Sequence, residues 1–178
     1  MENVTFSIGN LALIDKVDAE TDFFRKVFGR VGGKAKNFLS CVKLLMYNKL
    51  GNCASINRVN DFLPQELAEI LGFKKQPCTK QVYRAVERLG EYHSLVLEKY
   101  QEYISGLGLV DDNQFTDFSS SYFEGSKSAL GELGYSRDGQ PGKKQLTFGV
   151  SVGLNGVPTA LTIQKGNVAD KKHMKKMI

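Results

Sequence analysis

The sequence predicts an α+β protein in two parts, a helical N-terminal region over residues 1–110 and an antiparallel β-meander over residues 111–178. In the first part, apolar residues recur three and four positions apart, as they do in amphipathic helices. Beyond Asp111-Asp112-Asn113 the apolar period changes to two, which is the period of a strand. The change of period sets the boundary between the two parts.

Composition indicates a folded chain and excludes several classes of protein. The chain has 178 residues, of which 42% are hydrophobic and 24% charged, so disorder and collagen are excluded. Its net charge of +5 agrees with a nucleic-acid partner without identifying one. No apolar run approaches the roughly 20 residues that span a bilayer, and no signal peptide begins the chain. We therefore expect a cytoplasmic protein with no membrane partner. The three cysteines form no C-x-x-C pair, which favours reduced thiols over a zinc site.

The first part predicts a series of helices. Apolar residues keep helical spacing over residues 23–28, 38–45 and 67–71. The longest predicted helix begins at Thr79, an acceptable N-cap, and ends at Gly106 with a kink near Gly90. The run Gly29-Arg-Val-Gly-Gly-Lys-Ala35 lacks the spacing and the hydroxyl of a phosphate-binding loop, so it predicts a glycine-rich turn between helices.

Residues 65–72 and 79–89 have the outline of a helix-turn-helix. The second helix would place Lys80, Gln81, Tyr83 and Arg84 near its start, where a recognition helix meets base edges and phosphates. The joining segment is longer than the usual three or four residues. An ordinary helical hairpin with a solvated face is therefore the alternative.

The second part predicts three strands and a short helix. Residues 114–123, 144–154 and 157–163 are the strands, and Asn155-Gly156 predicts a type I′ hairpin turn. Residues 170–178 predict the start of an amphipathic helix with Met174, Met177 and Ile178 on its apolar face. Three strands and one short helix leave one sheet face uncovered, so we expect the chain to be shorter than the fold that it encodes.

Two polar residues of this part are candidates for chemistry. Asp117 lies inside a strand, where β-propensity disfavours a carboxylate. It is either a ligand for a hard cation such as magnesium or a sheet-edge residue bonded to nearby hydroxyls. Arg137 lies in a polar, turn-forming stretch, where it either forms a fork for phosphate or belongs to a plain loop.

Four motifs follow one another along the second part: Thr116-Asp117-Phe-Ser-Ser-Ser-Tyr-Phe-Glu124-Gly125, Gly134-Tyr-Ser-Arg-Asp138, Asn155-Gly156-Val-Pro158 and Gly166-Asn167-Val-Ala-Asp170. In this order and spacing they resemble the DDE transposases of bacterial and archaeal insertion sequences. The upstream run Tyr83-Arg-Ala-Val-Glu-Arg-Leu-Gly90 looks like the helical region that precedes the catalytic domain in that family. The resemblance covers more than half of the chain.

The resemblance implies a ribonuclease-H-like catalytic domain, of which this chain holds the opening meander. It places the family's first acidic residue at Asp117. In the family, three carboxylates hold two divalent ions, Mg²⁺ or Mn²⁺, which activate the nucleophile and stabilise the leaving oxygen at a DNA phosphodiester. Arg137 and the Gly166 motif would have structural or DNA-facing roles. The implied partner is DNA at the ends of the element, and the implied location is the nucleoid.

The chain departs from the family pattern in its acidic residues. The family's second Asp and its Glu follow later elements, and this sequence has no counterpart of either. We therefore expect a truncated transposase that does not bind the metal stably and is inactive by itself, because carboxylate count sets metal affinity. The alternative is a regulatory module that binds DNA, a full-length transposase or a second copy of itself, without catalysis.

Overall fold

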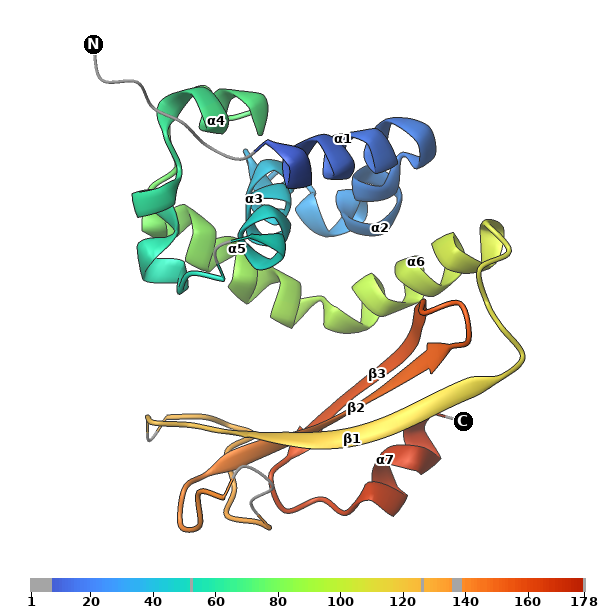
Figure 1. Ribbon diagram of the computed structural model, residues 1–178. Coiled ribbons are helices and arrows are strands. Elements are labelled where there is room, and N and C mark those ends of the chain that lie inside the picture. The colour runs from blue at the N-terminus through green and yellow to red at the C-terminus, as the bar shows by residue number, and fades with distance from the viewer. Residues whose placement is uncertain (1–7, 52, 126, 136–138, 178) are drawn as a thin grey trace. The chain divides into compact units, whose positions relative to one another are not determined.

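A computed structural model describes residues 8–51, 53–125, 127–135 and 139–177 (Figure 1). Within these ranges the chain is a mixed α+β protein of helices and a three-stranded antiparallel sheet. It divides into two compact units, Met1–Tyr103 and Ile104–Ile178. Each unit has its own packing.

The first unit is helical, as the 3.6-residue periodicity predicts. Its elements are α1 (Gly9–Thr21), α2 (Phe23–Gly32), α3 (Phe38–Leu50), the 3₁₀ helix η1 (Ile56–Phe62), α4 (Gln65–Ile70) and α5 (Thr79–Glu91), followed by α6 (His93–Gly106), whose last three residues belong to the second unit. One apolar core joins them, and its fully buried members include Val31 of α2, Leu44 of α3, Leu67 of α4 and Val82 of α5. Burying such side chains gives about 1.5–3 kcal/mol each, which is what holds these short helices together.

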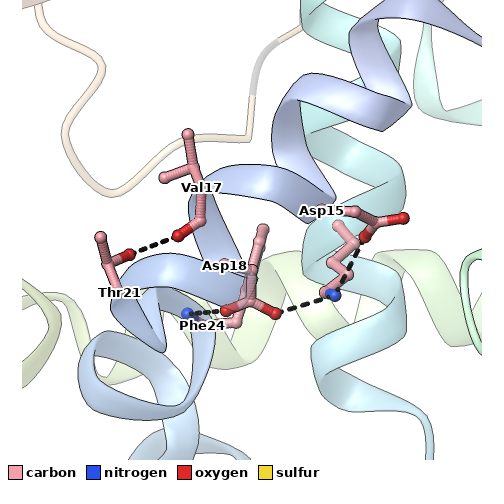
Figure 2. A network of polar contacts seen from close by, with 6 residues as sticks. Asp15, Val17, Asp18, Thr21 and Phe24 are labelled. Atoms are coloured by element: carbon pink, nitrogen blue, oxygen red, sulfur yellow. Dashed lines mark hydrogen bonds and ion pairs between the residues drawn. The ribbon is translucent and has the colours of Figure 1, made fainter.

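A polar network ties α1, α2 and α3 together at the edge of this core (Figure 2). Lys43 of α3 lies 2.9 Å from Asp18 and 3.3 Å from Asp15, both on α1. Asp18 also accepts a hydrogen bond of 3.0 Å from the Phe24 backbone N–H at the start of α2. Burial alone would lower the pKa of Lys43, but hydrogen bonds and charge from Asp18 and Asp15 raise it overall. Lys43 therefore stays charged and joins α3 to α1, and Asp18 joins α1 to the start of α2.

The helix predicted from Thr79 to Gly106 is divided in two. The break falls at Tyr92, close to the expected kink at Gly90, and it separates α5 from α6. The N-cap of α5 is Cys78, whose backbone N–H donates to Gln81 Oε1 over 2.9 Å, so Thr79 is the first helical residue instead of the cap.

The second unit contains the predicted meander, in the order β1 (Gln114–Tyr122), β2 (Gln145–Gly153) and β3 (Pro158–Lys165). Both pairings are antiparallel. The prediction of a type I′ turn is wrong. That turn needs a positive φ at both central residues, and here Gly156 alone has one, of 78°. The turn is closed by Gly156 N–H donating to the Gly153 carbonyl, 2.9 Å, and Gly153 N–H donating to the Val157 carbonyl, 3.0 Å. This is the longer hairpin class, in which a β-turn is followed by one left-handed residue.

The helix α7 (Asp170–Met177) packs on one face of the sheet (Figure 1). The expected apolar face is wrong at Met174, which is 40% exposed, and the buried residue of α7 is His173. Met177 is half-buried, and Ile178 lies outside the described residues. The Nδ1 of His173 lies 2.7 Å from Thr162 Oγ1 and its Nε2 2.8 Å from Thr147 Oγ1. Thr147 donates its own proton to the Lys165 carbonyl, 3.0 Å, so the hydrogen-bond network assigns the ring proton to Nε2.

The two faces of the sheet differ in polarity. The face under α7 carries mostly hydroxyl, amide and glycine positions, among them the buried Ser120, Thr147 and Ser151, together with the ring of Phe118. The opposite face carries apolar side chains, and Phe115 and Ile163 on it are 65% and 50% exposed. Hydrogen bonds of His173 with Thr162 and Thr147, together with the Phe118 ring whose centroid lies 5.5 Å from that of His173, therefore hold α7 to this face.

Candidate nucleic-acid interface

The helix-turn-helix outline corresponds to α4 and α5, with residues 71–78 between them. This link is long but fixed at both ends. Its first residues are anchored by the buried Leu71 and Phe73, and the Phe73 N–H donates to the Ala68 carbonyl over 2.9 Å. Its last residues are held to η1, because Asn60 Nδ2 donates to the Pro77 carbonyl over 2.8 Å. The second helix therefore starts from a defined position.

The predicted DNA-facing residues of α5 separate into two kinds. Lys80 and Arg84 are exposed and lie one turn apart, and within the described part of the chain neither makes an ion pair. Gln81 uses its Oε1 to cap the helix, and Tyr83 donates its hydroxyl to Asn57 Oδ1 on η1 over 2.9 Å. The two cations are free to meet an anion, whereas Gln81 and Tyr83 also hold the helix in place.

A third cation, Arg88, continues this row at the same four-residue spacing. Its Nε donates to the Val31 carbonyl at the end of α2, and its guanidinium lies 5.1 Å from the Tyr92 ring centroid. Sequence reasoning did not single out Arg88. The spacing of Lys80, Arg84 and Arg88 was the available signal, but a basic row on a helix is usually a solvated face.

Asp117 lies at the middle of β1, opposite Val150 of β2 in the sheet register. Its side chain is exposed, and its Oδ1 accepts a hydrogen bond from the next residue's N–H, at Phe118, over 2.8 Å. In the ranges that the structure describes, no group of three or more His, Cys, Asp or Glu could hold a metal ion. Asp117 alone does not fit the three-carboxylate site that the resemblance implies, and we derive no metal-dependent step from it.

The motif glycines form a close backbone packing that we call the glycine clasp, made of Glu132, Gly134, Gln145 and Gly166. Glu132 and Gln145 exchange two backbone hydrogen bonds, of 3.1 and 2.9 Å. A Cβ added at Gly134 would lie 2.0 Å from the Gly166 carbonyl oxygen, and one at Gly166 would lie 2.0 Å from that of Gln145. Only glycine fits at either position.

Gln145 is the side chain at the centre of the glycine clasp. It is 1% exposed, and its Nε2 donates to the Tyr135 carbonyl over 2.6 Å and to the Gly166 carbonyl over 3.2 Å. Two motifs that lie far apart in the sequence are thus joined by one amide, and their role here is structural. Arg137, in the first of these motifs, lies outside the described residues.

Comparisons of the chain with protein-family models, with curated proteins and with solved structures give no match. Within the described ranges, no helix is long and apolar enough to cross a membrane.

Proposed function

We propose that this chain binds DNA through the outer face of α5 and belongs to an insertion-sequence transposase. The observation that carries the proposal is the pair of exposed cations, Lys80 and Arg84, which lack ion pairs in the described part of the chain. They lie near the start of a helix that follows α4 and a fixed link. Cations in this position neutralise phosphates and position the helix on a duplex.

The motif order of the second unit supports the transposase part of the proposal, since the described residues of the four motifs lie on or beside the meander. The opening meander of a ribonuclease-H-like domain is what the resemblance implies for this unit. The proposed activity of the chain is DNA binding, at the ends of the element, and this implies a nucleoid location. Catalysis is not part of the proposal, because Asp117 has no carboxylate cluster in the described ranges.

The test is a salt titration of DNA binding by the full chain, with a fluorescent duplex and anisotropy as the readout. Each phosphate contact contributes about 0.9 to the slope of log K against log salt. We expect Lys80→Gln and Arg84→Gln each to reduce that slope by about 1. Lys49→Gln is the matched control. Lys49 is an exposed lysine in the last turn of α3, and its substitution removes the same charge.

Two results would contradict the proposal. The first is that the wild-type chain shows no salt-dependent binding of any duplex, which would mean that it makes no phosphate contacts. Equal slopes for Lys49→Gln and the two α5 variants would mean that net charge alone, and no defined surface, attracts the DNA.

A further inference from the structure

We propose that a pocket beside α5 is a binding site for one phosphate group and the apolar group attached to it. The pocket has a volume of about 490 Å³ and lies within the first unit. Its walls come from the turn after α2, the start of α3 and the side of α5. The volume falls within the range of about 300–1,000 Å³ that is usual for small-ligand sites.

Three cations line this pocket: Lys36 from the turn, and Arg84 and Arg88 from α5. In the described part of the chain, neither Lys36 nor Arg84 has an ion pair or a hydrogen bond from its side chain. Like charges that gather at one concavity repel one another, and a bound anion offsets that repulsion. Guanidinium and ammonium groups also supply the charge-assisted donors that phosphate oxygens accept.

Arg88 is already in position before any ligand arrives. Its Nε donates to the Val31 carbonyl and its guanidinium stacks on Tyr92, while a guanidinium has four further N–H donors. The turn passes close to it at Gly33, where φ is +49° and an added Cβ would lie 3.3 Å from Arg88 Nη2. This glycine-rich turn lacks the features of a phosphate-binding loop. Its close approach to Arg88 instead places Lys36 in the same pocket as the two arginines.

The rest of the lining limits what the ligand can be. Glu87 and Glu91 also line the pocket. Glu87 lies three positions after Arg84 and Glu91 three positions after Arg88, which is the spacing of neighbours on a helix, but within the described residues neither carboxylate forms an ion pair. Three cations and two carboxylates give the lining a net charge of +1, so the pocket itself accepts a single phosphate group. Phe38 and Ala85 form an apolar floor for a sugar or a base, so the ligand class is a nucleotide unit.

Either a free nucleotide or a DNA strand could supply such a unit. We assign the phosphate to a DNA backbone phosphodiester, because Arg84 belongs both to the pocket and to the exposed cations of α5. In this respect the inference rests on the proposed function. It adds a defined phosphate position on the surface that the proposed function uses.

The experiment uses the full chain labelled with ¹⁵N, titrated in parallel with inorganic phosphate, with dTMP and with a duplex. The backbone N–H signals of Ala35, Lys36 and Ala85 report the pocket. The test variant is Lys36→Gln. The matched control is Lys34→Gln, which removes an equal charge from an exposed residue two positions away that does not line the pocket.

We expect the pocket signals to shift with all three probes in the wild type and in Lys34→Gln. In Lys36→Gln the affinity for dTMP should fall about tenfold or more, because one charge-assisted contact is lost. The salt slope of duplex binding should fall by about 1 in Lys36→Gln.

Equal dTMP affinity in the two variants would overturn the phosphate site. Pocket signals that move with dTMP and not with the duplex would overturn the DNA source. The salt slope of duplex binding could fall by about 1 in Lys80→Gln and stay unchanged in Lys36→Gln. That result would refute this inference and leave the proposed function standing. If the wild-type chain bound no duplex at all, the proposed function would be refuted instead.

Discussion

The glycine clasp predicts a specific pattern of stability losses. In Gly166→Ala the new Cβ would lie 2.0 Å from the Gln145 carbonyl oxygen and 2.5 Å from that of Glu132. Both obstacles are backbone atoms, so no side-chain rotation relieves the contact. The two segments must separate by about 1 Å to reach the 3.0 Å below which real Cβ contacts are essentially absent.

That separation exceeds what the hydrogen bonds of the clasp tolerate. The two backbone bonds between Glu132 and Gln145 are 2.9–3.1 Å long, and the Gln145 amide makes two more to carbonyl oxygens. Each bond contributes about 0.5–1.5 kcal/mol net. We expect Gly166→Ala to cost about 3 kcal/mol, and Gly134→Ala to cost about the same, because its Cβ meets the Gly166 carbonyl.

Native-state hydrogen exchange of the Glu132 and Gln145 amides measures this loss directly, because both amides donate within the clasp. Their protection should fall by about two orders of magnitude in either variant. The double variant should lose little more than each single one, since both break the same contacts. The control is Gly125→Ala, where an added Cβ meets nothing within 4 Å. Additive losses, or unchanged protection in the single variants, would refute the reasoning.

Three further predictions concern His173, Cys41 and Gly33. His173→Ala should cost about 3–5 kcal/mol in urea unfolding of the second unit, because two threonine hydroxyls lose their partner and a cavity is left; a cost below about 1 kcal/mol would contradict the buried position. Burial raises the pKa of the Cys41 thiol to about 11. A thiolate-directed reagent at pH 8 should therefore modify two cysteines per folded chain and three after denaturation, the reactive pair being the exposed Cys53 and Cys78. Gly33→Ala should lower the thermal midpoint of the first unit, since φ there is +49°, whereas Gly90→Ala, with no neighbour within 4 Å, should not.

Local pattern was sufficient to predict most elements of the fold. Apolar spacing predicted α2, α3, α4 and the α5–α6 pair but neither α1 nor η1, and alternation over residues 144–154 predicted β2 within a residue at each end. The errors lie where local rules compete. Asn155-Gly156 suits two hairpin classes, and the observed one needs a positive φ at Gly156 alone. The face of α7 was misjudged because a histidine with two hydroxyl partners is buried in preference to a methionine.

The candidate sites divide in the same way. The sequence predicted Lys80 and Arg84 near the start of the second helix, and the structure shows both of them exposed there. The sequence could not show that Arg88 is pinned to the Val31 carbonyl, or that Lys36 lines the same pocket. These contacts join residues about fifty positions apart, and no local spacing encodes them.

Helix and strand periods are local properties of the chain, so the sequence predicts the type and order of most elements. The charged residues are likewise read directly from it. Which of those residues meet depends on the tertiary structure. Packing of α2 and α3 against α5 gathers three cations at one pocket, and closure of the glycine clasp joins two distant motifs through the Gln145 amide. Both depend on close approach between segments remote in sequence. That approach is set by the packing inside each unit.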